Sequence, residues 1–430
     1  MSWSQILSVV VFVGAYVLIA TERVHRVAAA LGGAALMLAL RLTDGETAYH
    51  SAEAGVDWNV VFLLLGMMII VGVIKQTGLF EFLAIAAAKR ARGRPFAVLA
   101  LFVVITATAS AALDNVTTVL LIAPVTFLVC DRLGLDAIPY LIAEVMASNI
   151  GGTATLIGDP PNIIIASRAG LSFNDFLVHL APFIVVLMVV FVLVCRWLFR
   201  DAFRYDEDRV AEVMRLSERE AIRDRTLLWQ SLAVLALVLA GFVLHTTLHL
   251  EPSVIALLGA GLLVLISKVT TEDAIADVEW ETLVFFMGLF VMVGALVKTG
   301  VIGAISENLA AAVGGEPLLA VMVLLVGSAL LSAVVDNIPY VATMSPIVGD
   351  LAGGQGPHGE PLWWALALGA DLGGNATAVG ASANVVVLGL AARNGTPISF
   401  WKFTRYGLVV ATLSVLLAAP YLWLRYFVLA

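Results

Sequence analysis

Cysteine is nearly absent from this chain, which has only Cys130 and Cys195 among its 430 residues. Two isolated cysteines make neither a CxxC motif nor a disulfide framework, which argues against a cysteine-based metal centre and a disulfide-stapled domain. A Walker A lysine pattern is also missing, which argues against ATP binding by this chain. We therefore expect no cofactor, no bound metal and no enzymatic activity.

Charged residues are scarce as well. They make up 13% of the chain, against about 25% in a typical soluble domain. The net charge of −8 argues against a nucleic-acid partner, because proteins that bind nucleic acids are basic. Hydrophobic residues instead make up 61%, and the mean hydropathy is +1.00. Water cannot solvate such a chain, so the composition predicts an all-α membrane protein surrounded by a lipid bilayer.

Long apolar runs are abundant. A membrane-spanning helix needs about 20 mostly apolar residues, and the sequence predicts about 10–12 transmembrane segments on this basis. Short apolar runs, interrupted by glycine and proline, lie between the long ones; such segments at matching places in two halves are typical of transporter binding sites. The long runs cover 4–20, 26–41, 58–75, 95–112, 175–199, 228–247, 252–268, 281–298, 316–335 and 403–425, and the short runs 115–130, 137–148, 162–168, 338–349, 361–370 and 384–392.

Lysine and arginine in short loops mark the cytoplasmic side of a membrane protein. The loop after the third run carries Lys75, Lys89 and Arg90, and the segment 200–227 is rich in arginine and in acids. The loop at 42–57 has no lysine or arginine. We therefore place the first two in the cytoplasm and expect the N-terminus outside, in the inner membrane of a bacterial or archaeal cell.

The sequence repeats itself at a fixed offset of 222 residues. A shared offset over about 110 residues, without a gap, indicates two copies of one structural unit. Val56-Asp57-Trp58 aligns with Val278-Glu279-Trp280, Gly66 with Gly288, Thr77-Gly78 with Thr299-Gly300, Asp114-Asn115 with Asp336-Asn337, Pro124 with Pro346, Gly151-Gly152 with Gly373-Gly374, and Asn162 with Asn384.

The two copies should have opposite orientations. The run at 58–75 ends at a cytoplasmic basic loop, so it crosses from the outside to the inside. From the cytoplasmic segment 200–227 the chain crosses out and back through two spans. The run at 281–298 therefore starts inside and crosses in the opposite direction. Inverted repeats are an architecture for alternating access to a central site. We expect N-terminal helices at 1–55, repeat 1 at 56–199, a charged cytoplasmic linker at 200–227, connecting helices at 228–277, and repeat 2 with a C-terminal helix at 278–430.

A glycine-rich polar motif recurs in both copies, at Ser148–Asn162 and Asp371–Asn384. Paired glycines permit unusual dihedral angles, and Pro160-Pro161 prevents a helix from continuing. Unwound backbone at membrane depth is tolerated where it is buried in protein or lines a cavity. Each repeat should therefore contain a discontinuous helix that binds a small polar solute. The candidate substrate-binding residues are Asn115, Asn149, Gly152, Thr153, Thr155, Asn162, Asn337, Gly374, Asn375, Thr377 and Asn384.

Acidic residues at membrane depth form a second group of candidates. Asp114 and Asp336 each follow a long apolar run and open a short one, which predicts a re-entrant hairpin in each repeat. Either could simply cap a helix, but an ionisable residue inside a membrane is a functional candidate. Burial can tune a carboxylate that carries a proton. The candidates for proton coupling are Asp114, Asp159, Asp336, Asp371 and Glu144.

At these motifs the sequence resembles the ArsB/NhaD ion-transporter superfamily, which includes the melanosomal P protein. Asn149 to Asn162 is similar to the P-protein version, whereas Asp371-Leu372-Gly373 and Asn337-Ile338-Pro339 resemble the arsenite efflux permeases. Ser148-Asn149-Ile150 departs from the Ser-Asn-Thr signature of the related dicarboxylate carriers. The resemblance covers nearly the whole chain and implies two hairpins and two discontinuous helices, with substrate between the repeats.

These observations favour a secondary transporter. No lysine or arginine lies between residues 95 and 131 or between 299 and 392, so a neutral or cationic solute fits the motifs best. We expect proton-coupled efflux of arsenite or antimonite, with a sodium/proton antiporter and an anion or dicarboxylate carrier as alternatives. The expected partners are a small inorganic solute, protons and the lipid bilayer; a homo-oligomer and a cytoplasmic ATPase partner, which the resemblance allows, remain open.

Overall fold

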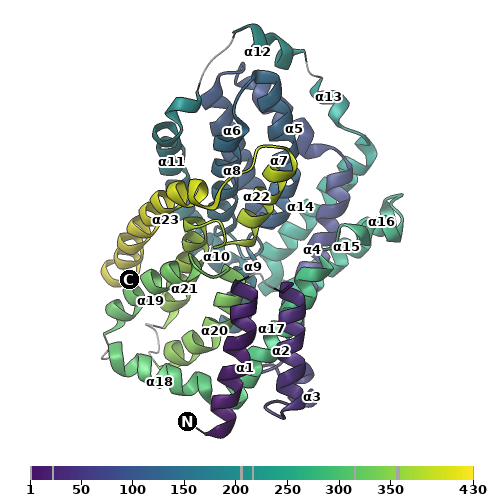
Figure 1. Ribbon diagram of the computed structural model, residues 1–430. Coiled ribbons are helices and arrows are strands. Elements are labelled where there is room, and N and C mark those ends of the chain that lie inside the picture. The colour runs from purple at the N-terminus through teal and green to yellow at the C-terminus, as the bar shows by residue number, and fades with distance from the viewer. Residues whose placement is uncertain are drawn as a thin grey trace.

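The computed structural model describes residues 2–21, 24–203, 207–215, 217–313, 316–354 and 359–429. Every regular element in these ranges is helical, and the fold is that of an all-α membrane protein (Figure 1). Seven of the described helices are long and apolar enough to cross a membrane, and shorter apolar helices accompany them. Both observations agree with the fold class expected from the sequence.

The two repeats contain corresponding helices in the same order, except that one short helix of repeat 1, at Phe173–His179, has no separate counterpart among the described residues of repeat 2. Repeat 1 comprises α4 (Trp58–Gln76), α5 (Leu79–Arg90), α6 (Pro95–Ala112), α7 (Asn115–Leu133), α8 (Ala137–Gly152), α9 (Pro160–Ala169), α10 (Phe173–His179) and α11 (Ala181–Leu198). Repeat 2 comprises α17 (Trp280–Lys298), α18 (Val301–Val313), α19 (Pro317–Ser332), α20 (Asn337–Gly354), α21 (Glu360–Gly373), α22 (Ser382–Arg393) and α23 (Phe400–Trp423).

Each repeat folds a helical hairpin whose tip is an aspartate. Helix α6 ends at Ala112, and the Asp114 carboxylate accepts a hydrogen bond from the backbone N–H of Thr117 at 2.8 Å, which caps α7. In repeat 2, Asp336 caps α20 in a related way, through the N–H of Ile338 at 3.0 Å. The second helix of the first hairpin is longer than the apolar run at 115–130, because it continues through the polar residues up to Leu133.

Each repeat also contains a discontinuous helix. Helix α8 ends at Gly152, seven residues of turns and bends follow, and α9 starts at Pro160, whose missing N–H is tolerated at the first position of a helix. In repeat 2, α21 ends at Gly373 and α22 starts at Ser382. The run at 175–199, expected as one span, is divided into α10 and α11 at Leu180.

Hydrogen bonds between hairpin and discontinuous helix are duplicated at the 222-residue offset. The Ser110 hydroxyl donates to the backbone oxygen of Ser148 at 2.7 Å, and the corresponding Ser332 donates to that of Ala370 at 2.6 Å. The close packing is duplicated too, because a Cβ on Gly151 or on Gly373 would lie 2.3 Å or 2.5 Å from backbone atoms of the neighbouring hairpin helix. The repeat is therefore a repeat of contacts as well as of sequence.

Six helices that we call the frame pack against the hairpins and discontinuous helices, which we call the core. The frame comprises α1 (Trp3–Ala20), α2 (Arg26–Ala39), α14 (Arg225–Leu248) and α15 (Pro252–Ile266), together with α4 and α17. In the frame, the first long helix of each repeat packs on a helix that precedes the other repeat. Gly66 of α4 packs on Ala256 of α15, and Gly288 of α17 packs on Ala30 of α2. Each repeat thus completes its frame with a helix that precedes the other repeat.

Charged contacts define two faces of the molecule. On the linker face, Lys89 pairs with Glu218 of the linker at 2.5 Å, and this pairing lowers the pKa of the Glu218 carboxyl. On the opposite face, Lys298 at the end of α17 pairs with Asp44 and lowers its pKa to about 2. Figure 1 shows the linker helices α12 (Glu207–Met214) and α13 (Glu218–Ala221) at the top and the N-terminus at the bottom.

Candidate functional site

A cluster of buried amides lies where the hairpins and discontinuous helices meet. The amide nitrogen of Asn115, at the start of α7, donates to the Asp159 carboxylate at 2.9 Å and to the amide oxygen of Asn149 at 3.1 Å. Asn337, its counterpart at the start of α20, lies 3.4 Å from both oxygens of Asp159. The two hairpin tips therefore converge on a single carboxylate, which is fully buried.

Asn149 connects the two repeats. Its amide nitrogen donates to the side-chain oxygen of Asn375 at 2.9 Å and to that of Asn384 at 3.1 Å. All three side chains are fully buried. Because the three residues come from both discontinuous helices, the structure places this part of the predicted substrate site at the contact between the repeats.

The unwound segments are held by asparagine side chains in this state. Asn162 donates to the backbone oxygen of Thr155 at 3.0 Å, and its counterpart Asn384 donates to that of Thr377 at 2.9 Å. The same two amides reach the backbone oxygens of the expected glycines, Gly152 at 3.4 Å and Gly374 at 2.8 Å. In both repeats, an asparagine of the same motif therefore donates to the backbone carbonyls of the unwound segment.

Three threonines of the motif also bond to the backbone. Thr153 donates back to Asn149 within its helix at 2.8 Å. Thr155 and Thr377 donate to backbone oxygens of their own hairpins, at 2.6 Å and 2.5 Å. These hydroxyls hold the loop geometry in the state described here.

Two of the predicted carboxylates lie in the core with no basic partner among the described residues. Asp159 accepts hydrogen bonds from amides, as given above. Asp371 is fully buried beside Thr153 and Asn162, yet neither of its oxygens accepts a hydrogen bond of ordinary geometry from the described part of the chain. An isolated buried carboxylate is costly when ionised. Both side chains therefore suit a group that binds a proton or a cation.

Glu144 lies apart from the amide cluster. It is buried between α7 and α8, where it accepts a hydrogen bond from the Thr126 hydroxyl at 2.6 Å. The structure thus brings four of the five predicted carboxylates towards the meeting point of the repeats, and Glu144 packs in a different environment.

A cavity of about 850 Å³ leads from the linker face to the tip of the second hairpin. Its outer part is lined by residues at the starts of α2 and α17, among them His25, Glu279 and Glu281, and its inner part by Asp336 and Ser382. Since α17 ends at the opposite face, these starts lie at the linker face. This cavity therefore opens towards the linker face.

One residue of this cavity was missed in the sequence. The guanidinium of Arg26 donates to the Ser382 hydroxyl at 3.0 Å and lies 3.4 Å from that of Thr282. The segments of the polar motifs, 95–131 and 299–392, contain no lysine or arginine, and Arg26 precedes both of them in the chain. An arginine at the end of an apolar run usually anchors a helix at the membrane interface, and no local pattern connects it to a serine 356 positions later.

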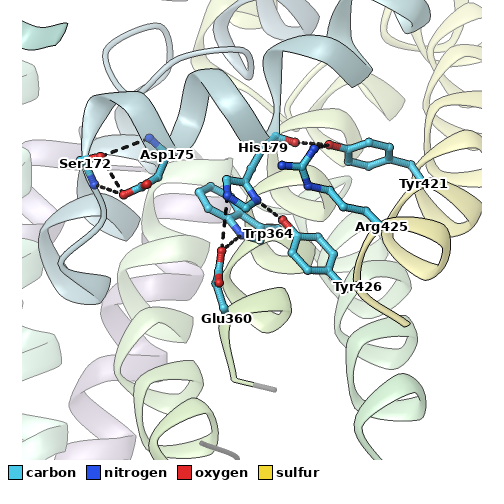
Figure 2. A network of polar contacts seen from close by, with 8 residues as sticks. All are labelled: Ser172, Asp175, His179, Glu360, Trp364, Tyr421, Arg425 and Tyr426. Carbon is cyan, nitrogen blue, oxygen red and sulfur yellow. Dashed lines mark hydrogen bonds and ion pairs between the residues drawn. The ribbon is translucent and has the colours of Figure 1, made fainter. Parts of the chain in front are cut away.

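A second polar network lies at the opposite face, among α10, α21 and the C-terminal helix (Figure 2). The ring of His179 stacks on that of Trp364, with centroids 4.8 Å apart, and bonds to the hydroxyl of Tyr426. Glu360 accepts a hydrogen bond from the Trp364 indole at 3.1 Å. Burial, and then the charge of Arg425, lowers the pKa of His179. The network attaches the last helix to both repeats.

Sequence and structure comparisons are consistent with this geometry. The profile of the citrate transporter family, CitMHS, matches residues 16–369. The chain belongs to the citrate transporter family. Among members and relatives, an uncharacterised transporter of Mycobacterium tuberculosis is 56% identical over 428 residues, with 99% of both chains covered. The P protein of Homo sapiens is 34% identical over 492 residues, covering 96% of this chain and 59% of that protein. The expected likeness to the P protein is therefore confirmed.

Two solved transporters share the fold of this family member. The YdaH transporter of Alcanivorax borkumensis superposes with a TM-score of 0.62 at 17% identity, covering 85% of each chain. MtrF of Neisseria gonorrhoeae superposes with a TM-score of 0.63 at 14% identity, covering 100% of this chain and 96% of that one. The chain is a multi-pass membrane transporter, and the more specific resemblance to arsenite permeases stays a prediction.

Proposed function

We propose that this chain is an inner-membrane carrier that exports a small neutral hydroxylated solute, arsenous acid or its antimony analogue, in exchange for protons. The observation that supports this most directly is the composition of the buried site. Asp159 and Asp371 lie among amides and hydroxyls, without a basic partner among the described residues. Such a site can hydrogen-bond a neutral trihydroxy solute, while its carboxylates exchange a proton.

The cavity supports a cycle of alternating access. The cavity reaches the second hairpin from the linker face. A second cavity of about 550 Å³ lies at the opposite face, beside the corresponding residues Asn59, Leu63 and Ile163 of repeat 1. The linker face is cytoplasmic in this proposal, so the larger cavity would admit the solute from the cytoplasm. The carboxylates at the meeting point of the repeats, Asp114, Asp159, Asp336 and Asp371, are the candidates that would then carry the coupled proton inward.

A carboxylate anion is the second candidate, and Arg26 favours it. A guanidinium recognises carboxylates well. The matching family model is that of citrate transporters, and citrate is a carboxylate anion. The cavity also contains Glu279, Glu281 and Asp336, however, so its acids outnumber Arg26. This balance makes the neutral solute the better supported choice. Cation exchange through the same carboxylates would need sodium.

Everted membrane vesicles that contain the full chain test the proposal. Radioactive or mass-detected arsenite uptake is measured under an imposed proton gradient, with and without sodium, in membranes that lack a partner ATPase. Uptake that stops on addition of a protonophore and is indifferent to sodium supports proton-coupled arsenite export. Citrate uptake in place of arsenite supports the anion carrier, and sodium-dependent loss of the pH gradient supports cation exchange.

A further inference from the structure

Arg26 belongs to the frame, yet its shorter hydrogen bond is with the core. Its helix α2 packs on α17 of the frame, and Thr282 and Phe285 of α17 flank the guanidinium, with the Phe285 ring centroid 5.7 Å away. The hydrogen bond to Ser382 at 3.0 Å crosses from the frame to the first residue of α22. This contact must break if the core moves relative to the frame.

Ser382 relays the contact to a carboxylate. Its hydroxyl donates to Asp336 at 2.5 Å, while the other oxygen of Asp336 caps α20 through Ile338. One hydroxyl therefore separates the guanidinium from the Asp336 carboxylate. A nearby positive charge favours the ionised form of a carboxylate.

Other charged or titratable groups also face this pair. Glu279 is the N-cap residue of α17: one of its oxygens accepts a hydrogen bond from Thr282 at 2.9 Å, and the other is buried without a hydrogen-bond partner among the described residues. Acids near Asp336 favour its protonated form, so Arg26 opposes them. The groups around the pair are His25, Glu279, Glu281, Asp159, Tyr16 and Tyr340.

We propose that Arg26 is a positioning residue that stabilises the ionised carboxylate of Asp336, through Ser382, while the cavity is open to the linker face. The consequence for transport depends on the alternating access proposed above. When the core moves away from Arg26, the surrounding acids and the apolar environment favour protonation of Asp336. The return movement then restores Arg26 and releases the proton towards the linker side, so one arginine of the frame couples conformation to proton binding.

The test measures protonation without transport. The purified full-length protein in detergent is labelled with dicyclohexylcarbodiimide, which reacts with protonated carboxyls in apolar surroundings, at a series of pH values. Mass spectrometry of peptides then gives the pH of half-labelling for Asp336. Arg26→Gln should raise this midpoint by about one pH unit, a roughly tenfold change in proton affinity. Arg26→Lys keeps the charge, so its pH of half-labelling for Asp336 should stay close to that of the unmodified protein.

A second variant and an internal control complete the experiment. Ser382→Ala removes the relay but keeps the arginine, and should move the midpoint in the same direction as Arg26→Gln. Glu144 contacts Thr126 and not this pair, so its pH of half-labelling, read from the same samples, should be the same in all variants. An unchanged Asp336 midpoint in Arg26→Gln overturns the proposal; if that variant does not fold, an unchanged midpoint in Ser382→Ala does. If the Asp336 midpoint shifts as expected but the protein transports no arsenite, the role of Arg26 stands and only the proposed solute is rejected.

Discussion

At the scale of single residues, the amide cluster has one carboxylate at its centre and another beside it. Asp159→Asn and Asp371→Asn should each reduce proton-driven uptake in vesicles to the level of membranes without the chain, because the amide cannot carry a proton in exchange. Glu144→Gln should keep most of the activity, since Glu144 bonds to Thr126 outside the cluster. Full proton coupling in Asp159→Asn and Asp371→Asn would assign the proton to another group.

Asn149 is the residue on which the contact between the repeats depends most. Asn149→Ala removes hydrogen bonds to Asn115, Asn375 and Asn384, and leaves buried amide groups unsatisfied, each at a cost of about 1–3 kcal/mol. We expect a clearly lower melting temperature in detergent. Thr108→Ala, which removes an exposed hydroxyl bonded within its own helix, should leave the melting temperature almost unchanged. Equal melting temperatures for the two variants would contradict this role of Asn149.

The sequence predicted the residues at the meeting point better than it predicted their partners. The fixed offset identified Asn115 and Asn337, and the structure places both beside Asp159. The offset could not indicate that Asn162 and Asn384 bond to their own loops, because that depends on how each loop folds back. Nor could it indicate Arg26, which lies outside the repeats and is aligned with no residue of them.

At the scale of helices, two glycines allow hairpins and discontinuous helices to touch. A Cβ on Gly373 would lie 2.5 Å from the backbone of Ala329 in α19. Gly373→Ala should therefore destabilise the protein by about 1–3 kcal/mol, measured as a lower melting temperature and less folded protein in the membrane. Gly389→Ala is the matched control, because among the described residues no atom beyond its own stretch of helix lies within 4 Å of its Cβ position. If both variants behave alike, the close approach of α19 and α21 does not matter for stability.

The attachment of the last helix should depend on pH. The pKa of His179 is lowered by burial from its usual value of 6.5. The unfolded chain then binds a proton more readily than the folded one, so stability should fall as the pH drops below about 6.5. The melting temperature of the purified protein between pH 7.5 and 5.5 measures this, and His179→Gln should reduce the pH dependence. An unaltered pH dependence in His179→Gln would assign the effect to other groups.

At the scale of the whole molecule, the orientation in the membrane is the main open prediction. Lys89 pairs with Glu218, so both lie on one face, and Ser8 near the N-terminus bonds to Thr299 on the opposite one. Reporter domains fused after Lys89 and after Glu218 should be cytoplasmic, and one fused before Ser2 should be outside. A reporter pattern with Lys89 and Glu218 on different sides would contradict the inverted arrangement.

The exchanged packing of the frame also limits how such a chain can be divided. Gly66 needs Ala256 and Gly288 needs Ala30, so neither half of the molecule contains the partner of its own long helix. A half-length protein could complete its frame only from a second copy inserted upside down. Dual topology in a homodimeric ancestor, followed by gene fusion, would produce the arrangement seen here, with the charged linker as the join that fixes the two orientations permanently.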